Sequence, residues 1–234
     1  MGPAADFLYA DIIRRASEAG FLCRGGFHPE TGDGVPGALA DEQGTLVLLG
    51  NAGPALWRAF GAAGGNVDIE PNPLDRWTRR TVTPLAAALG AVALFPFDGP
   101  PYLPFQRWAA KAEGLSASPL GILIHPDFGL WHAYRAALLF ARKIDLPRRE
   151  IRESPCVRCA KKPCLKGCPV EAFAKGFYDV PACVRYLEDP LGAACVNFGC
   201  FARHACPVGR DFAPDPAQAR FHMQAFLRAN GAKT

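Results

Sequence analysis

Apolar and polar residues along the first two thirds of the chain follow two alternating patterns. Some stretches carry apolar residues at helical spacing, which predicts amphipathic helices, and others are short apolar runs between Gly or Pro, which predict buried strands. Helices and strands that alternate in this way are typical of a layered α/β (α+β) structure. The expected helices cover residues 6–19, 55–62, 72–80 with a kink or restart at Pro84, 105–113, 130–142 and 215–230, and the expected strands cover residues 45–49, 91–97 and 120–124.

The segments between these elements offer the first candidate chemistry. A long loop rich in Gly, Pro and Asp is expected from residue 24 to residue 44. Residues 50–54 are expected to form a glycine-rich turn between a strand and a helix, a geometry that presents backbone N–H groups to an anion. Asn72 is expected to cap the helix that Pro73 begins. Asp98 follows a strand, where α/β folds place reactive groups, although Asp before Gly-Pro is also a common turn residue.

Eight of the nine cysteines are concentrated between Cys156 and Cys206. Such density indicates iron–sulfur clusters, structural zinc or a disulfide framework. Closely spaced cysteines followed by Cys-Pro are typical of cubane iron–sulfur sites, and in two-cluster proteins the Cys before Pro ligates the other cluster. The first group reads Cys156-x2-Cys159-x4-Cys164-x3-Cys168-Pro169, and after Cys183 the second group reads Cys195-x4-Cys200-x5-Cys206-Pro207.

Two 4Fe-4S clusters are the preferred interpretation of these eight cysteines. Zinc would favour two paired C-x2-C segments, and the chain has one, Cys156 with Cys159. Disulfides are the least expected, because no secretory signal is present. By the crossover rule one cluster is assigned to Cys156, Cys159, Cys164 and Cys206, and the other to Cys168, Cys183, Cys195 and Cys200.

Composition and charge narrow the class of protein without identifying a substrate. The chain has 234 residues, of which 50% are hydrophobic, and a net charge of +4, so it can bury a core. Basic residues gather around the cysteines, either as a docking surface for an acidic electron donor or as an ordinary solvated loop. The longest nearly apolar run, residues 84–97, is too short to span a membrane, and reduced thiols without a signal peptide predict a cytoplasmic protein. The expected domains are an α/β core over residues 1–150, an iron–sulfur module over residues 151–212, and a C-terminal helix over residues 213–234 that packs on the core.

Three segments carry a first resemblance to a known family. They read LVLLGNAGPALW at residues 46–57, NPLD at 72–75 and ILIHPDFGLWHAYR at 122–135. In order and spacing they resemble the cobalamin-processing proteins of the CblC type, which implies a flavin nitroreductase-like core and a site for cobalamin. On that resemblance the cofactor-binding residues are expected to include His125, Gly129 and Trp131. By spacing alone, His125 is more typical of a turn or core histidine than of a metal ligand.

The C-terminal half carries a second resemblance. Phe128-Gly129-Leu130-Trp131, the cysteine groups, and Phe198-Gly199-Cys200 follow one another as in epoxyqueuosine reductase, the cobalamin- and iron–sulfur-dependent family of tRNA queuosine synthesis. This resemblance implies a small ferredoxin-like iron–sulfur module, and it places Asp98 where that family keeps its catalytic proton donor. The chain departs from the family pattern by offering Cys195 in place of a cysteine between Cys200 and Cys206. It is also shorter at its N-terminus, so tRNA is not the expected partner.

Together these observations predict an iron–sulfur oxidoreductase that delivers low-potential electrons to a bound corrinoid. It would process cobalamin or reduce a small-molecule substrate, and its expected partner is a redox protein of the flavodoxin or ferredoxin type, with no membrane. The alternative is a ferredoxin-like electron-transfer protein without a corrinoid, and a zinc-stabilised binding module is a third possibility.

Overall fold

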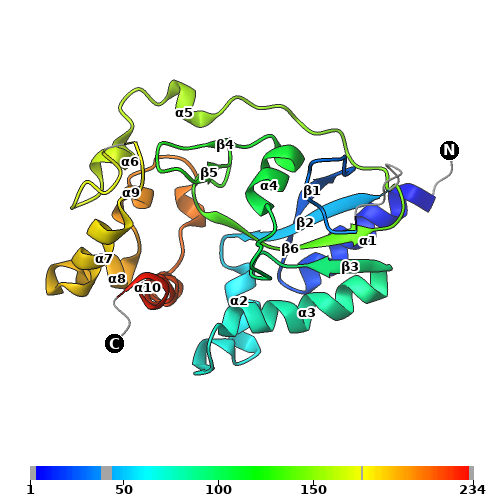
Figure 1. Ribbon diagram of the computed structural model, residues 1–234, viewed down its shortest axis with the longest axis horizontal. Helices are drawn as coiled ribbons and strands as arrows, with labels where there is room; N and C mark the ends of the chain where they lie inside the picture. The colour runs from blue at the N-terminus through cyan, green and yellow to red at the C-terminus, as the bar shows by residue number, and fades with distance from the viewer. Residues whose placement is uncertain (1–3, 38–43, 175, 232–234) are drawn as a thin grey trace. The chain divides into compact units, whose positions relative to one another are not determined.

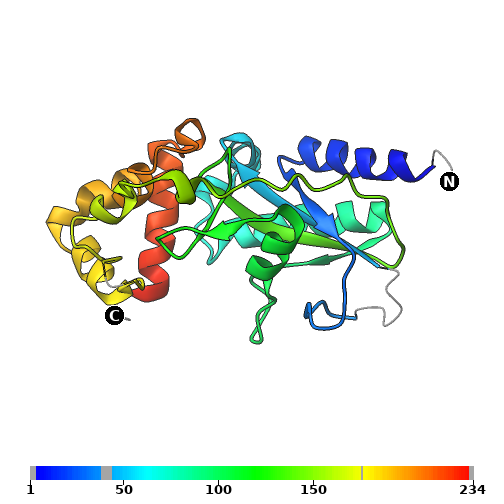
Figure 2. The ribbon, with the colours of Figure 1, turned by 90° about the horizontal axis from the view of Figure 1, so that it is seen from above.

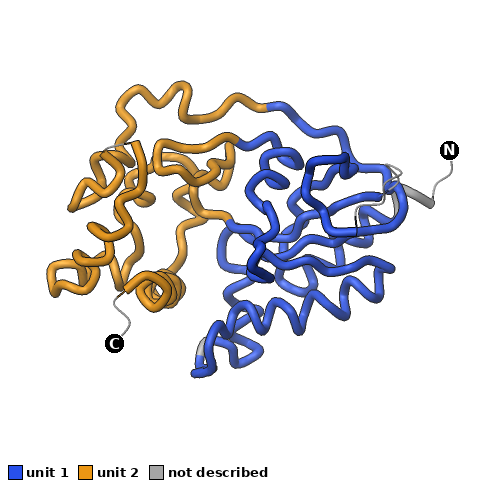
Figure 3. Tube along the Cα trace, viewed as in Figure 1, with its two compact units in different colours: residues 1–115, 133–151 blue, residues 116–132, 152–234 orange. Residues whose placement is uncertain are grey.

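The chain divides into two compact units, which are coloured separately in Figure 3. Unit 1 comprises residues 1–115 and 133–151, and unit 2 comprises residues 116–132 and 152–234. The segment 116–132, expected in the N-terminal core, therefore belongs with the cysteine-rich part. The computed structural model describes residues 4–37, 44–174 and 176–231.

Unit 1 is a four-stranded sheet flanked by helices (Figure 1). The strand order is β1-β2-β6-β3, and the pairs β1 with β2 and β3 with β6 are antiparallel. Helix α1 lies on one face of the sheet and α4 on the other (Figure 2). In chain order the elements are α1 (Ala4–Glu18), β1 (Leu22–Phe27), β2 (Thr45–Ala52), α2 (Ala55–Ala62), a short 3-10 helix (Gly65–Val67), α3 (Pro73–Leu89), β3 (Ala91–Leu94), α4 (Phe105–Glu113) and β6 (His132–Phe140).

The core of unit 1 is built around β2. Residues 46–49 of this strand have no solvent exposure, so both of its faces are covered. Phe60 of α2 is also fully buried and packs with Trp57 and Trp77, at ring-centroid distances of 5.5 and 5.7 Å. The strand expected from this apolar run is confirmed, because a strand covered on both faces reads as a continuous hydrophobic segment.

A buried ion pair ties three elements of unit 1 together. Arg24 of β1 is 1% exposed and donates two hydrogen bonds of 2.8 Å to the carboxylate of Glu113, the last residue of α4. It donates a third, of 3.2 Å, to the hydroxyl of Tyr134 in β6, which itself donates to Glu113. Because losing one partner of such a pair leaves a buried charge uncompensated, these three side chains strongly favour one arrangement of β1, α4 and β6.

The helix expected over residues 130–142 is wrong, because this segment contains strand β6. Its alanines and leucines have high helix propensity. The strand nevertheless lies between β2 and β3, and Ala136, Ala137 and Leu138 are fully buried there. Burial in an inner strand outweighs local propensity, which is a weak prior.

The loop expected from residue 24 is also wrong at its start, where β1 extends to Phe27. Gly25 has a φ of 68°, and the pairing with β2 changes register between Cys23 and Gly26. A Cβ at Gly26 would lie 2.5 Å from the carbonyl oxygen of Leu46. The glycines that suggested a loop therefore form an irregularity in the strand and allow close pairing.

The glycine-rich turn expected over residues 50–54 is shorter than predicted. Strand β2 continues to Ala52, and the turn is confined to Gly53, with a φ of 68°, and Pro54. Gly50 lies within the strand, where a Cβ would approach the carbonyl oxygen of Ala133 to 2.2 Å. Its role is thus to let β6 approach β2.

The residue ranges expected for the remaining helices of unit 1 are closer to the structure than the expected details of α3. The helices expected over residues 55–62 and 105–113 are confirmed as α2 and α4. Helix α3 runs through Pro84 without a break. Pro84 has no N–H to donate to the carbonyl four residues before it, but it is exposed, so water can donate a hydrogen bond to that carbonyl instead. Asn72 precedes α3, but its side chain makes no capping hydrogen bond.

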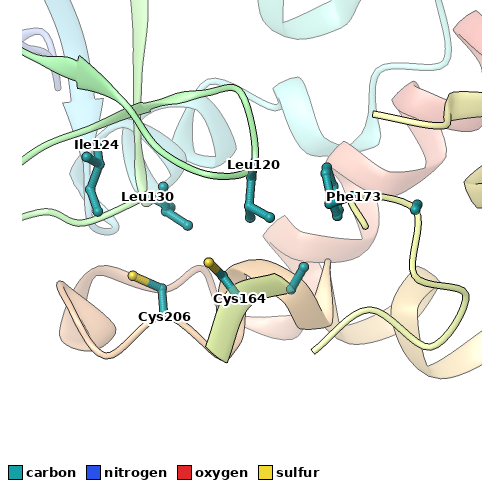
Figure 4. Packing of buried hydrophobic residues seen from close by; sticks show 8 residues of the cluster. Leu120, Ile124, Leu130, Cys164, Phe173 and Cys206 are labelled. Atoms are coloured by element: carbon teal, nitrogen blue, oxygen red, sulfur yellow. The ribbon is translucent and has the colours of Figure 1, made fainter. Parts of the chain in front are cut away.

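Unit 2 consists of a small hairpin and short helices around the cysteines. Strands β4 and β5 pair with Ser116 opposite Ile124. The buried cluster of this unit contains thiols as well as apolar side chains, and Cys164 and Cys206 lie opposite Leu120, Ile124 and Leu130 (Figure 4). The elements are β4 (Ser116–Ala117), β5 (Leu123–Ile124), α5 (Pro155–Arg158), α6 (Pro163–Lys166), α7 (Val180–Glu188), a 3-10 helix (Pro190–Gly192), α8 (Ala193–Phe198), α9 (Phe201–His204), a second 3-10 helix (Arg210–Phe212) and α10 (Pro216–Asn230).

The C-terminal helix α10 belongs to unit 2. Asp215 caps it by accepting a hydrogen bond of 2.8 Å from the backbone N–H of Gln218. The helix packs against α8 and α7, whereas the sequence predicts packing on the N-terminal core. Within the described residues, no helix combines the length and the apolar character that crossing a membrane requires.

Candidate metal centre

Four cysteines line one cavity of unit 2, and we call them the first thiol set. Cys156 lies in α5, Cys159 directly follows it, Cys164 lies in α6 and Cys206 follows α9. The cavity has a volume of about 500 Å³. Most of its other walls are apolar and include Pro119, Ile124, Leu130, Pro163, Pro207 and Val208. Three basic residues also line it: Arg158, Lys161 and Lys162.

Local sequence explains how the first thiol set converges. The hydroxyl oxygen of Ser154 caps α5 by accepting a hydrogen bond of 3.4 Å from the backbone N–H of Cys156. Lys162 has a φ of 38°, and this left-handed residue turns the chain before Pro163 begins α6. The longer spacing before Cys164 thus forms a turn that returns it to the cavity of Cys156.

The other four cysteines of this segment form a second thiol set. Cys183 lies in α7, Cys195 in α8, Cys200 immediately before α9 and Cys168 after α6. Cys195 is buried, and Cys168, Cys183 and Cys200 are partly buried.

One hydrogen bond reaches a sulfur atom of the second set. The Sγ of Cys168 accepts it, at 3.4 Å, from the backbone N–H of Ala172.

Burial controls the protonation of these thiols. It raises the pKa of the thiol at five positions, which keeps them protonated at neutral pH in the metal-free chain. Because metals bind thiolates, metal binding at either set must displace protons. All nine cysteines are free thiols. The five positions are Cys156, Cys164, Cys183, Cys195 and Cys200.

Cys206, from the second Cys-Pro pair, lines the same cavity as Cys156, Cys159 and Cys164, which is the arrangement that the crossover rule predicts. Assignment of Cys168 to the second set stays a prediction. Among the residues that the structure describes, no three His, Cys, Asp or Glu side chains are arranged to hold a single metal ion. Binding of a cluster by either set stays a prediction.

The donor set fits a cubane cluster in three respects. Each set supplies four thiols, the ligand number of such clusters. The first cavity is largely apolar, which limits water at the ligands. In α9, three residues after Cys200, the Nε of Arg203 is buried without a hydrogen-bond partner among the described residues.

Asp98 lacks the environment expected of a proton donor. It lies in unit 1 beyond β3, and its carboxylate forms an ion pair with Arg79 of α3. The Asp98 side chain is 44% exposed. The structure therefore does not by itself supply the buried setting that a carboxylic proton donor needs, and the catalytic role of Asp98 stays a prediction.

His125 and Gly129 have structural partners within unit 2. The Nδ1 atom of His125 accepts hydrogen bonds from the backbone N–H groups of Asp127 (3.0 Å) and Phe128 (3.2 Å), which closes the turn after β5. Gly129 has a φ of 57°, and a Cβ there would lie 2.0 Å from the carbonyl oxygen of Val208. The turn therefore packs against the segment that follows Cys206, and cofactor binding by either residue stays a prediction.

Trp131 is 5% exposed and lies beside α9. The guanidinium of Arg203 lies over its ring, 4.3 Å from the centroid, and the ring of His204 is 4.7 Å away. Its Nε1 is buried without a hydrogen-bond partner. The three expected cofactor-binding residues thus all lie in unit 2, and Asp98 lies in unit 1.

Comparisons with known proteins place the chain only distantly. No protein-family model matches it, and no curated protein matches it. Among solved structures it is similar to a crystal structure of epoxyqueuosine reductase with an epoxyqueuosine-modified tRNA stem loop, at 15% identity and a TM-score of 0.49. The alignment covers 92% of this chain and 71% of the other. A similarity this distant assigns neither an activity nor a family.

Two side chains near the second thiol set escaped the sequence analysis. Tyr178 and Arg203 have no ligand-like spacing to the cysteines, so the ligand pattern gives no signal for them. Arg203 could have been noticed as the basic residue between Cys200 and Cys206. Tyr178 lies five residues before Cys183, and its ring stacks on Phe173 with 4.6 Å between the ring centroids.

Proposed function

We propose that this protein is an iron–sulfur oxidoreductase that binds two 4Fe-4S clusters and delivers low-potential electrons to a bound corrinoid. The observation that carries the proposal is the convergence of four cysteines, Cys156, Cys159, Cys164 and Cys206, on one cavity. Four thiols match one cubane cluster in ligand number, and the presence of Cys206 among them follows the crossover of the Cys-Pro cysteines. The remaining four cysteines of unit 2 are proposed to bind the second cluster. When bound, the clusters supply one-electron transfer at low potential.

The residues of unit 2 would hold and shield the clusters. The thiols ligate iron, and the aliphatic walls around the first thiol set keep water from it. Arg158, Lys161 and Lys162 line the same cavity and are exposed. These cations favour docking of an acidic redox protein of the flavodoxin or ferredoxin type.

The corrinoid part of the proposal rests on the two resemblances of the sequence. Residues 46–57, 72–75 and 122–135 carry the CblC-type pattern. Cobalamin or a small molecule is the proposed acceptor. Asp98 is proposed for proton transfer only if the bound corrinoid covers its exposed carboxylate.

The test is anaerobic purification of the full chain with iron, acid-labile sulfide and zinc quantified. About eight irons per chain are expected from two cubane sites. Replacing one ligand of each set, with Cys159→Ala and Cys183→Ala, should each abolish one site and leave about four irons. The matched control is Cys23→Ala, because Cys23 lies in unit 1 beside the hydroxyl of Tyr9 and should not affect iron content. Zinc in place of iron would overturn the proposal.

A spectral titration of the iron-loaded protein with hydroxocobalamin tests the acceptor. A shifted corrin spectrum supports the corrinoid, and Asp98→Ala then tests the proton donor. Bound iron without any corrin shift would contradict the corrinoid part and identify an electron-transfer protein. A separate titration of the iron-loaded protein with a tRNA stem loop, followed by a direct binding measurement, tests whether the acceptor is RNA instead.

A further inference from the structure

The chain around the two thiol sets carries surface charges of opposite sign. Between Cys156 and Cys168 the sequence has four basic residues and no acidic one, whereas between Cys168 and Cys200 it has four acidic and two basic residues. The basic residues of the first stretch are all exposed, and they are Arg158, Lys161, Lys162 and Lys166. Three acidic residues of the second stretch are exposed, and they are Glu171, Glu188 and Asp189.

The cations of the first stretch lie at the wall of the first cavity. Arg158, Lys161 and Lys162 line it together with the thiols of the first set. Arg158 forms an exposed ion pair of 2.8 Å with Glu153. Among the described residues, no carboxylate pairs with Lys161 or Lys162. Two cations without an ion-pair partner therefore lie beside the thiols, and such charges steer an acidic protein toward this surface.

The same stretch offers an apolar contact. Val157 of α5 lies between Cys156 and Arg158 and is 68% exposed. Protein interfaces combine an apolar centre with a polar rim, and Val157 with the neighbouring cations has this composition. Residues 157–167 include no aromatic residue, whereas sites for single-stranded RNA stack bases on aromatic side chains. The surface therefore favours an acidic protein over RNA.

The two thiol sets also share one buried cluster of side chains. Cys164 and Cys206 belong to it, and Cys168, Cys183 and Cys200 pack against it. An electron that enters at the first set thus has a short route to the second set within unit 2.

We propose that an acidic electron-donor protein of the ferredoxin type docks on residues 157–162 and reduces the cluster of the first thiol set, which then reduces the cluster of the second. This inference rests on the proposed function, since it concerns clusters that those sets bind. The reduced donor loses one electron, and the first cluster gains it and passes it on. The acidic residues between Cys168 and Cys200 repel the same donor from the second set.

The order of the clusters is tested by rapid mixing of the iron-loaded full chain with a reduced plant-type ferredoxin, while the loss of cluster absorbance is recorded. Cys159→Ala removes the first cluster, and the ferredoxin should then reduce the remaining cluster at least about tenfold more slowly. Cys183→Ala keeps the first cluster and should keep rapid reduction. A photoreduced deazaflavin, which is small and needs no docking surface, should reduce the clusters of both variants.

The docking surface is tested by charge reversal. Lys161→Glu combined with Lys162→Glu should slow reduction by the ferredoxin about tenfold at low ionic strength, and the difference should shrink as salt is added. The matched control is Arg220→Glu combined with Arg228→Glu, which changes the net charge equally at exposed positions of α10. It should change the rate by less than about twofold. Val157→Ser should slow the reaction by a smaller factor than the lysine pair.

The possible outcomes separate this inference from the proposed function. A wild-type chain without iron contradicts the proposed function itself. Equal slowing by the lysine and arginine pairs, or rapid reduction of Cys159→Ala by the ferredoxin, overturns the inference while the proposed function stands. So does a lysine pair that weakens binding of a short RNA and leaves reduction by the ferredoxin unchanged. If the reversed lysine pair loses iron, Lys161→Gln combined with Lys162→Gln decides, because it removes the charges without reversing them.

Discussion

The two units of this protein have cores of different kinds. In unit 1, residues 46–49 and Phe60 are fully buried in a layer of strands and helices. In unit 2, Cys164 and Cys206 belong to the buried cluster, and α5, α6 and α9 are each four residues long. Helices of that length are not stable by themselves. The difference indicates that unit 1 is held by apolar burial. On the proposed function, unit 2 would depend in addition on the clusters that its thiols bind.

The largest effect should follow removal of the metal. Chelation of the iron-loaded protein under reducing conditions should abolish most amide protection from hydrogen exchange in α5 to α9 and leave the strands of unit 1 protected. The reason is that metal binding at thiol sites supplies folding free energy. Hydrogen exchange measured by mass spectrometry checks this prediction. Equal protection of both units after chelation would contradict it.

The second perturbation acts on unit 1 and creates a cavity in its core. Phe60→Ala should lower the free energy of unfolding of that unit by about 3–5 kcal/mol, because the ring is fully buried against Trp57 and Trp77. Denaturant unfolding of the metal-free protein, followed by tryptophan fluorescence, measures the loss. Val92→Ala is the control, since Val92 of β3 is 61% exposed in the same unit, and its effect should be below about 1 kcal/mol. Iron content should be unchanged in Phe60→Ala, and a loss of iron there would argue that the units are not independent in stability.

A glycine pair tests whether the turn after β5 supports the first thiol set. Gly129→Ala and Gly121→Ala both place a side chain at a positive φ, of 57° and 78°, which costs about 1–2 kcal/mol. Only the new Cβ at position 129 also meets backbone, at the carbonyl oxygen of Val208, whereas position 121 faces open space. Gly129→Ala should therefore lose a further ~1–3 kcal/mol by overpacking and some of the iron bound near Cys206. Equal iron content in the two variants would contradict this role.

The smallest effect concerns an ion pair of unit 1. Burial by itself would raise the pKa of Asp33. The hydrogen bonds from Lys111 (2.8 Å) and from the backbone N–H of Glu30 (2.8 Å), together with the charges of Lys111 and Arg107, outweigh it and hold that pKa below its usual value. A depressed folded-state pKa gives stability that is present above the unfolded-state value near 4 and lost as the pH falls through the folded-state pKa. Lys111→Met should thus cost about 1 kcal/mol or less near neutral pH, and the difference should shrink below about pH 4. Unfolding of the metal-free protein at several pH values checks this, and a difference independent of pH would contradict it.

Sequence reasoning worked where local chemistry decides the structure. The helices α2 and α4, the apolar strand β2 and the convergence of the first thiol set follow from spacing and from the nearest neighbours in the chain. It failed where distant segments decide. Strand β6 looks helical by composition, and only its position between β2 and β3 makes it a strand. Gly26 and Gly50 look like turn residues, and only the close approach of neighbouring strands explains them. The environment of Asp98 is equally non-local, because Arg79 comes from another element.

The position of β6 also has a consequence for synthesis on the ribosome. Strands β1, β2 and β3 leave the exit tunnel before residues 116–132, and β6 follows only after that segment. Until residue 140 has emerged, β2 and β3 each present an unpaired edge, which is a site for pairing with other chains. A nascent chain stalled near residue 115 would therefore need chaperone protection. Because each unit is built from two separate segments of the chain, no single cut in the sequence separates the two units.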